Sequence, residues 1–243
     1  MKEATQSKRK NSIDAIQFHD QIASEWSQKY KSGVFKQRFK LWSKIIEKYL
    51  KSDETWLDAG CGAGDLTKVI VKHCNHTIAF DPSKNMLQSL RNNTEIDLNQ
   101  VSIYTGKIND LSFIRGKKVS GIICSSVFEY LKNVDSALNE CHQILQNDGK
   151  LIVSIPTKGL NIRYFQKILR RIGIIFNIKL FNYLEHSVFY ETKDNFIRIL
   201  NQNGFDCLEV YDFKPNAEKI LYNFLAPVIC IYIAEKSKLS GKH

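Results

Sequence analysis

The chain has 243 residues, a formal net charge of +10 at pH 7, and a hydrophobic fraction of 43%. The length fits one α/β domain, or one domain with a lid, and the hydrophobic fraction is large enough for a sizeable core. The positive charge favours an anionic partner, such as nucleic acid, anionic lipid or an acidic substrate, without choosing among them.

The six cysteines are scattered and include no CxxC pair. They are typical of reduced core thiols in a cytoplasmic protein, and they argue against a disulfide framework or a zinc site. The N-terminus lacks the apolar run of a secretory signal. No charge-free run reaches the length of a membrane-spanning helix. We therefore expect a cytoplasmic protein.

The N-terminal part of the chain divides into a polar tail and a helical segment. Residues 1–11 are polar and basic, so we expect them to be disordered. Residues 12–50 have the apolar spacing of helices, and Gly33 is expected to separate two of them. This segment is expected either to pack on the core as a flap or to cover a ligand as a lid. In the lid interpretation Tyr30 and Arg38 point inward.

From residue 55 onward, short apolar runs alternate with stretches of helical spacing. This rhythm predicts an α/β fold with a mostly parallel sheet and helices on both faces. Ligands of such sheets bind beyond the carboxyl ends of the strands, near the point where the strand order reverses. The expected strands are 55–59, 77–80, 101–104, 119–124, 150–155, 205–213 and 228–234. The expected helices are 63–74, 83–91, 108–113, 133–146, 217–225 and one from Thr192 to Gly204.

A glycine-rich stretch follows the first expected strand, with glycines at positions 60, 62 and 64. The pattern predicts a tight turn and a helix start, where the backbone can approach a ligand closely. A dinucleotide-binding loop needs a further glycine against the pyrophosphate. Here that position is Asp65, and together with Asp58 it would repel a pyrophosphate. Acids beside a glycine turn suit a ligand with an ammonium and a sulfonium group, so a nucleotide-dependent oxidoreductase is disfavoured.

The run Asp-Ala-Gly-Cys-Gly-Ala-Gly at 58–64 resembles motif I, DxGxGxG, of the class I S-adenosylmethionine (SAM)-dependent methyltransferases. The stretch 79–87 is similar to the family's DxSxxML segment, and 124–131 is similar to its SxxVLEHL segment. The resemblance implies SAM as cofactor and one domain over 12–243. It also implies a Rossmann-like, doubly wound, seven-stranded sheet with an antiparallel last strand, a helical lid at 12–50 and a helical insert after strand five.

The same resemblance assigns cofactor contacts. The glycine loop passes under the methionine part of SAM, Asp58 helps to hold the amino group, and Asp81 accepts hydrogen bonds from both ribose hydroxyls, which one carboxylate can do. Lys107 stands where the family often has an acid on the adenine, so we expect Ile108 and Asn109 to contact the base instead. The full expected set is Asp58, Gly60, Cys61, Gly62, Gly64, Asp81, Pro82, Met86, Ile108, Asn109, Cys124, Tyr30 and Arg38.

The segment after strand four bears on the acceptor. Nucleic-acid amino methyltransferases carry an Asn/Asp-Pro-Pro-aromatic motif there, whereas 124–127 reads Cys-Ser-Ser-Val, so we do not expect nucleic acid as a partner. The segment resembles small-molecule O- and N-methyltransferases, including the ubiquinone-biosynthesis type. Some of those bind a metal with Glu, Glu and His, where this chain has Ser126, Glu129 and Tyr130, so we expect no metal. A non-catalytic SAM-binding or partner-binding scaffold stays open as an alternative.

Three residues are candidates for a general base. His186 is the strongest, because an imidazole has an unperturbed pKa near neutrality. Tyr30 and Glu129 are the other two. A base would matter more for methylation of a hydroxyl than of a neutral amine.

Residues 157–190 form a basic, hydrophobic insert that interrupts the strand–helix rhythm, and its part at 157–184 contains no acid. Three interpretations stay open. The insert is a cap over the substrate pocket, an amphipathic segment in peripheral contact with an anionic membrane, or a site where Arg163, Arg170 or Arg171 binds a soluble anionic substrate.

Overall fold

The computed structural model describes residues 15–158, 187–214 and 228–238. The expected tail at 1–11, most of the expected insert and the expected helix at 217–225 lie outside these residues.

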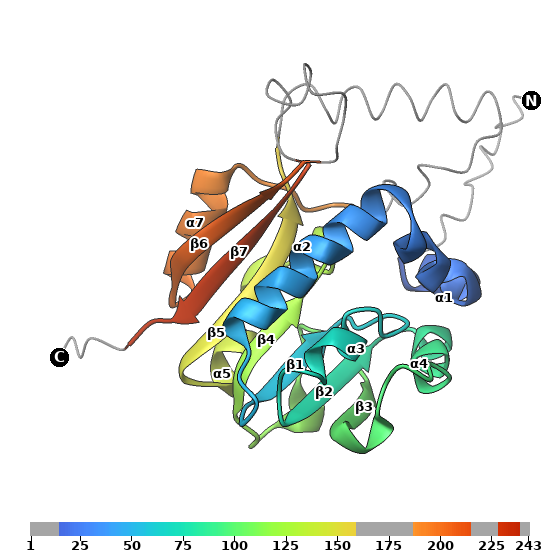
Figure 1. Ribbon diagram of the computed structural model, residues 1–243. Helices are drawn as coiled ribbons and strands as arrows, with labels where there is room; N and C mark the ends of the chain where they lie inside the picture. Colours follow the sequence, from blue (N-terminus) through green and yellow to red (C-terminus); the bar gives the residue numbers. More distant parts are fainter. Residues whose placement is uncertain (1–14, 159–186, 215–227, 239–243) are drawn as a thin grey trace, which may run out of the picture.

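The described residues form one seven-stranded sheet with the order β3-β2-β1-β4-β5-β7-β6 (Figure 1). The first five strands pair in parallel, and β7 runs antiparallel to both β5 and β6. The strand order reverses between β1 and β4, which lie side by side at the centre. This arrangement confirms the mostly parallel sheet with an antiparallel last strand. The strands are β1 Thr55–Ala59, β2 His76–Asp81, β3 Val101–Thr105, β4 Val119–Cys124, β5 Leu145–Pro156, β6 Phe205–Phe213 and β7 Ile229–Lys236.

Helices cover both faces of the sheet. Residues of α2, α3 and α4 share buried clusters with one face, and residues of α5 and α7 with the other. The helices are α1 Ala15–Trp26, α2 Gly33–Tyr49, α3 Thr67–Ile70, α4 Lys84–Arg91, α5 Val134–Ile144 and α7 Lys193–Gln202. The 3₁₀ helices are η1 Ser27–Lys31, η2 Leu98–Gln100, η3 Ser112–Ile114 and η4 Phe128–Tyr130.

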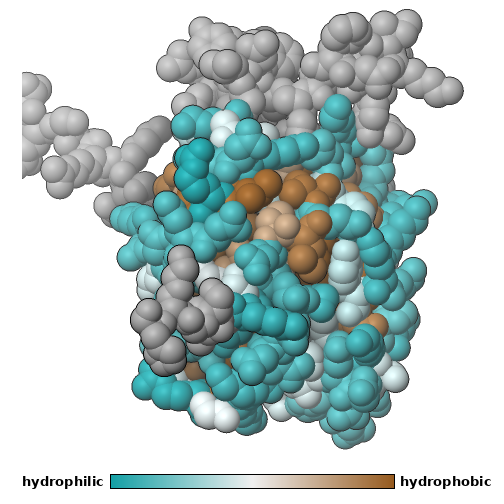
Figure 2. All heavy atoms as spheres, turned by 90° about the vertical axis from the view of Figure 1, so that its left-hand side faces the viewer, coloured by the Kyte–Doolittle hydropathy of each residue, from teal (hydrophilic) through white to brown (hydrophobic). Residues whose placement is uncertain are grey.

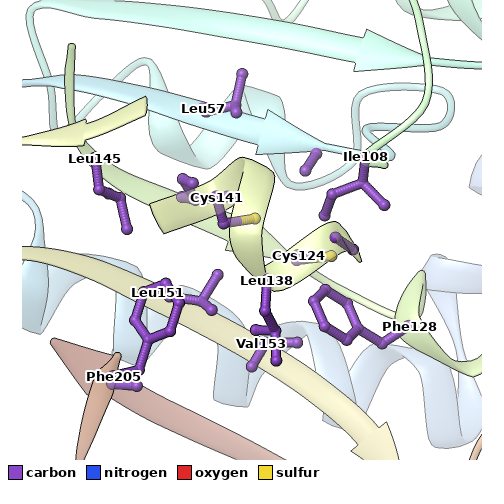
Figure 3. Close-up of a cluster of buried hydrophobic side chains, with 14 of the residues drawn as sticks. Leu57, Ile108, Cys124, Phe128, Leu138, Cys141, Leu145, Leu151, Val153 and Phe205 are labelled. Carbon is purple, nitrogen blue, oxygen red and sulfur yellow. The ribbon is translucent and has the colours of Figure 1, made fainter. Parts of the chain in front are cut away.

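The side chains of strand β1 alternate between the two faces of the sheet, as successive side chains of a strand do. They therefore pack against the helices on both faces. Trp56 is buried in the cluster that contains Trp42 of α2. Its neighbour Leu57 is buried in the cluster that contains Leu138 and Cys141 of α5 (Figure 3). A fully buried side chain of this size contributes about 1.5–3 kcal/mol. The central strand is therefore fixed from both sides, and its carboxyl end is held in place.

Three expected elements differ from the structure. The helix expected at 63–74 is reduced to α3, because Gly64 has φ +86° and the chain turns before a helix can begin. The helix expected at 108–113 is the short η3, which begins after the Asp110 side chain accepts a hydrogen bond from the Ser112 amide. Strand β5 begins at Leu145 rather than at residue 150, with Asp148 at φ +60° inside it.

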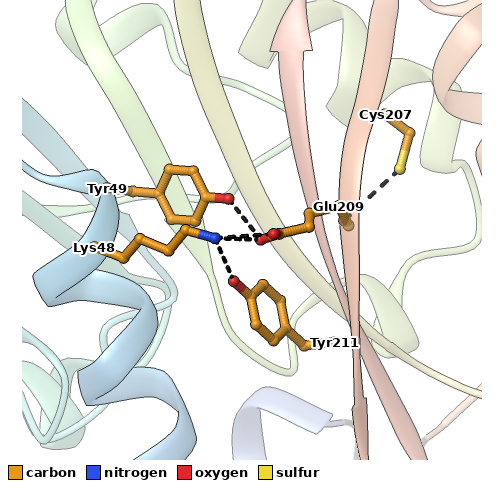
Figure 4. A network of polar contacts seen from close by, with 5 residues as sticks. All are labelled: Lys48, Tyr49, Cys207, Glu209 and Tyr211. Atoms are coloured by element: carbon orange, nitrogen blue, oxygen red, sulfur yellow. Dashed lines mark hydrogen bonds and ion pairs between the residues drawn. The ribbon is translucent and has the colours of Figure 1, made fainter.

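A polar cluster joins the C-terminal end of α2 to strand β6 (Figure 4). Lys48 Nζ lies 2.8 Å from Glu209 Oε2 and donates to Tyr211 Oη at 2.9 Å. Tyr49 Oη donates to the same carboxylate at 2.7 Å. The hydrogen bond from Lys48 and those of the two tyrosines lower the pKa of Glu209 to about 2. Because the ion pair is half exposed, it contributes little to the stability of the fold.

Figure 2 shows the face of the molecule on the side of β6 and α7. Most of this face is hydrophilic, and hydrophobic residues gather in one area of it. Val188 and Leu208 are each 52% exposed. Within the part of the chain that the structure describes, no helix has the length and apolar character needed to cross a membrane.

Candidate ligand-binding site

A cavity of about 530 Å³ lies at the carboxyl ends of β1, β2 and β4, where the strand order reverses. This is the edge at which doubly wound sheets bind their ligands, and the volume is in the range of small-molecule sites. The loops after β1, β2, β3 and β4 line one part of it. Residues of α1 and η1 line the part above them.

The glycine turn after β1 forms part of the cavity wall. The amides of Gly60 and Cys61 both donate to the Phe80 carbonyl of β2, at 2.9 and 3.0 Å. Gly60 has φ +70°, and a Cβ there would lie 2.3 Å from Val127 Cγ2. Gly62 has φ +53°, but a Cβ there would meet nothing closer than Trp26 Nε1 at 3.7 Å. Packing therefore requires a glycine at position 60, whereas Gly62 leaves the backbone open to the cavity.

Asp81 stands at the end of β2 and lines the same cavity. Its Oδ2 accepts a hydrogen bond of 3.0 Å from the Gly62 amide, and its Oδ1 accepts one of 2.8 Å from the Ser83 amide. Burial raises the pKa of Asp81 to about 6, although both amides act to lower it. Each carboxylate oxygen has a second lone pair. The side chain is thus oriented by the backbone and can still accept hydrogen bonds from a ligand.

Two further acids are buried beside the glycine turn. Asp58 is 2% exposed, accepts a hydrogen bond of 2.7 Å from Thr67 Oγ1, and has its pKa raised to about 7 by burial, with Asp81 and Asp65 adding to the effect. Asp65 is 5% exposed and accepts from Ser27 Oγ at 3.1 Å, and burial raises its pKa too.

Among the described residues, none of these three acids forms an ion pair with a basic side chain. Keeping buried carboxylates charged without a partner is costly. A cationic ligand in the cavity would offset that cost.

Arg38 of α2 supports the cavity wall from behind. It is 8% exposed and donates to Ser126 Oγ at 3.0 Å and to Tyr30 Oη at 3.3 Å. Both acceptors line the cavity. Burial, which outweighs the nearby Arg38, raises the pKa of Tyr30. The phenol is therefore neutral at physiological pH and is a weak candidate for a base.

Helix α1 is attached to the ligand loops by polar contacts. Ser83 Oγ, which caps α4 by accepting from the Met86 amide, donates to Asp20 Oδ1. Asn85 Nδ2 donates to the Asp20 carbonyl at 3.2 Å. The helix thus rests on the N-terminus of α4, directly after Asp81.

The structure brings together most of the residues expected to bind the cofactor. The cavity is lined by Tyr30, Asp58, Gly60, Cys61, Gly62, Asp81, Pro82, Met86, Ile108 and Asn109.

Four other residues of the sequence-based assignment are not among the lining residues. Gly64 packs under Ile96 and Leu90, and Arg38 lies behind Tyr30 and Ser126. Cys124 is fully buried in the α5 side of the core, near Cys141 (Figure 3). The Glu129 carbonyl accepts from the amides of Val188 and Phe189. His186 lies outside the described residues.

Other lining residues were not expected as ligand contacts from the sequence. They include His19, Trp26, Ser126, Tyr130 and Lys132. The sequence did contain a signal for two of them. Trp26 shares a helical face with Tyr30, and Tyr130 lies in the stretch similar to SxxVLEHL. His19 is seven positions before Trp26, and only the shared helical face could have indicated it. Within the described residues, no group of three His, Cys, Asp or Glu side chains could hold a metal ion.

The chain is similar in sequence to methyltransferases. A family model described as "Methyltransferase domain" matches residues 57–153, from β1 into β5. The "Uncharacterized methyltransferase C70.08c" of Schizosaccharomyces pombe is 24% identical over 178 residues, which is 68% of this chain and 65% of that protein. The "Ubiquinone biosynthesis O-methyltransferase" of Glaesserella parasuis is 26% identical over 187 residues, 73% of this chain and 76% of that protein. The chain thus spans less than two thirds of the fission yeast relative.

The fold is also similar to that of solved structures. The magnesium protoporphyrin IX methyltransferase of Synechocystis, solved with bound SAH, superposes with a TM-score of 0.64 at 18% identity. The superposition covers 90% of this chain and 98% of that one. At this level of identity the likeness shows a shared fold.

Proposed function

The chain carries a methyltransferase domain of the class I, SAM-dependent type, and from this premise we propose that it transfers a methyl group from SAM to an oxygen or nitrogen atom of a small molecule. The observation that carries the proposal is the group of buried acids at the glycine turn. Asp58, Asp65 and Asp81 line one cavity, and among the described residues none of them forms an ion pair with a basic side chain. SAM carries an ammonium and a sulfonium, and it fits such a site.

Each part of SAM has a counterpart in the cavity under this proposal. Asp81 would accept from the two ribose hydroxyls, because two amides already hold its carboxylate in a fixed orientation. The open backbone at Gly62 would let the methionine part lie close to the turn. Ile108 and Asn109, which follow β3, would contact the adenine. The carboxylate of Asp58 would attract the ammonium group of SAM.

The chemistry asked of the protein is mostly positioning. SAM supplies a methyl group that its sulfonium already activates. The chain must align the acceptor atom with that methyl group and exclude water, and good alignment can be worth about 7–11 kcal/mol. Helix α1 and η1 lie over the cavity, and Arg38 holds Tyr30 and Ser126 at its wall. These elements are suited to both tasks.

Two observations support a small, hydrophobic acceptor. The site is a cavity of limited volume with aromatic and apolar lining residues, and the loop after β4 is not the prolyl loop of nucleic-acid amino methyltransferases. A relative acts in ubiquinone biosynthesis.

For the insert at 157–184 we propose contact with a lipid-like acceptor or an anionic membrane. The composition of the insert supports this proposal. Flotation with anionic liposomes, compared between the wild-type chain and one with Arg170 and Arg171 changed to Glu, tests it.

The cofactor assignment is tested by calorimetry with SAM and with NAD. We expect SAM, and not NAD, to bind the purified protein. Adenosine should bind more tightly than 2′,3′-dideoxyadenosine, which lacks both hydroxyls that Asp81 would hold. No binding of SAM would overturn the proposal. Binding of SAM with no methyl transfer to any small molecule would favour the scaffold alternative instead.

A further inference from the structure

The outer face of α2 carries a row of lysines. Lys36, Lys40 and Lys44 are all exposed and lie four positions apart, so each is about one helical turn from the next. At 1.5 Å per residue, this lysine row spans about 12 Å along the helix axis. The opposite side of the helix packs on the sheet through Trp42 and Ile45, which are buried. The row therefore points away from the core, on a helix that lies across the sheet (Figure 1).

Within the described part of the chain, the lysine row forms no ion pair with an acid. The ion pair of α2 joins Lys48 to Glu209, and none of the others includes a lysine of the row. Like charges one turn apart repel each other and destabilise a helix. The row thus has a cost to the helix that no ion pair between described residues offsets.

Positive charge is distributed unevenly between the two helical layers of the described residues. Helix α2 carries four lysines and one arginine against one glutamate. Helix α5, on the other face of the sheet, carries two acids and no lysine or arginine, and the charges of α7 are mixed. The outer face of α2 is therefore suited to an anionic partner.

The lysine row begins near the cavity. Helix α2 follows directly after η1, whose Tyr30 lines the cavity. In the first turn of α2, Val34 is 48% exposed. One turn later, Arg38 donates to Ser126 and Tyr30 at the cavity wall. An exposed apolar side chain thus stands at the end of the helix that supports the cavity.

We propose that the outer face of α2, with the lysine row and Val34, docks the protein on an anionic bilayer. The lysines pair with lipid phosphates, and Val34 enters the boundary between the headgroups and the acyl chains. Because the docked helix begins beside the cavity, docking brings the cavity close to the bilayer. This surface is separate from the insert at 157–184, and the proposal does not rest on methyl transfer.

A bilayer fits this surface better than nucleic acid does. Proteins that bind single-stranded nucleic acid stack the bases on aromatic side chains. On α2, Phe35 and Phe39 are half-buried and Trp42 is buried, so none is exposed for stacking. The headgroup region of a bilayer accepts apolar and basic side chains together. A phosphate backbone has no apolar partner for Val34.

Vesicle co-sedimentation tests the surface, with phosphatidylglycerol and phosphatidylcholine vesicles as probes. We expect the full chain to bind the first and not the second. A lysine near an anionic surface contributes about five-fold to binding. The combined change Lys36→Gln, Lys40→Gln and Lys44→Gln should therefore weaken binding to phosphatidylglycerol about 100-fold. Val34→Ser should weaken it about 5-fold, because less apolar surface is buried.

The matched control changes Lys117, Lys118 and Lys238 to Gln. These lysines are exposed and lie at the opposite edge of the sheet, because the first two precede β4 and the third follows the antiparallel β7. The control removes the same net charge outside the proposed surface. It should weaken vesicle binding by less than about 3-fold, since salt screens charges that are distant from the bilayer. Circular dichroism and the Kd for SAM should match the wild type in both triple variants.

Four results would overturn the proposal. The first is a wild-type chain that does not bind phosphatidylglycerol vesicles, and the second is an equal loss in both triple variants, because net charge alone would then explain binding. The third is unchanged vesicle binding in the α2 variant. The fourth is an α2 variant that keeps vesicle binding and loses affinity for a DNA duplex or an RNA strand. Vesicle binding is measured without SAM, so a failure to bind SAM would count against methyl transfer alone.

Discussion

The guanidinium of Arg38 donates a hydrogen bond of 3.0 Å to the hydroxyl of Ser126, 88 positions further along the chain. Ser126 has φ +59°, a left-handed conformation that costs a residue with a side chain about 1–3 kcal/mol. Its amide is held in turn by Ser154 Oγ at 2.9 Å. Helix α2 and strand β5 therefore fix the loop after β4 in a strained shape at the cavity wall. Strain of this kind is usual where a loop must present groups to a ligand.

Removal of the Ser126 hydroxyl should destabilise the protein. In Ser126→Ala the buried Arg38 loses one acceptor while the left-handed backbone stays, so we expect the free energy of unfolding to fall by about 1–3 kcal/mol. Urea denaturation measures it. Ser43→Ala is the matched control, because its hydroxyl only bonds the Phe39 carbonyl one turn earlier on the same helix, and its effect should be under about 0.5 kcal/mol. Equal losses in both variants would contradict the role given to this contact.

Asp20 should be needed to hold α1 over the cofactor loops. In Asp20→Ala, Ser83 Oγ and the backbone amide of Asn85 lose their acceptor on α1, whereas the Asn85 side chain keeps the Asp20 carbonyl. We expect SAM to bind about 10-fold more weakly, a loss of about 1.4 kcal/mol, and chymotrypsin to cut α1 faster after Phe18 or Trp26. Asp135→Ala, which removes only a surface contact with Asn203, serves as the control. Unchanged affinity in Asp20→Ala would show that α1 does not contribute to cofactor binding.

Much of the fold could be predicted from the sequence, because local patterns decide it. Strand β1 follows from the apolar run at 55–59, and α7 follows from its capping Thr192, whose hydroxyl accepts from the Asn195 amide. The acids Asp58 and Asp81 could be placed at one edge, since parallel strands end together.

The rest depends on contacts between distant segments, which local patterns do not encode. Cys124 was expected to touch the cofactor, but its side chain lies on the face toward Cys141 and is fully buried. Arg38 was expected to touch the cofactor and instead supports two residues that line the cavity. The ring contact between His19 and Tyr130 joins residues more than a hundred positions apart. No periodicity predicts it.

Two glycines of the turn should respond differently to a methyl group. In Gly60→Ala the new Cβ would lie 2.3 Å from Val127, and its left-handed backbone adds strain, so we expect a loss of stability of about 2 kcal/mol or more. In Gly62→Ala the new Cβ would make only ordinary contacts, at 3.7 Å or more, so the loss of stability should be limited to the cost of the left-handed backbone, about 1 kcal/mol. Gly62→Ala should nevertheless weaken SAM binding, because the methyl group enters the cavity. Thermal unfolding and calorimetry separate the two effects.

Stability of the ligand-free protein should fall as the pH rises from about 4 to about 7. Burial raises the pKa of Asp58 to about 7 and of Asp81 to about 6, whereas an aspartate in the unfolded chain has a pKa of about 4. Between these values the folded protein binds more protons than the unfolded chain, so stability falls with rising pH. We expect a loss on the order of 2–3 kcal/mol for each carboxyl between about pH 4 and pH 7, measured by urea denaturation.

The affinity for SAM should change in the opposite direction, because a cationic ligand needs these carboxylates charged. We expect the Kd for SAM to fall as the pH rises from about 5.5 to about 8, with protons released on binding. Calorimetry in two buffers of different ionisation enthalpy measures that release. Asp58→Asn keeps an oxygen for the Thr67 hydroxyl and removes the charge, so it should flatten both pH profiles. A SAM affinity that is independent of pH in the wild-type protein would show that the buried acids do not hold the cation.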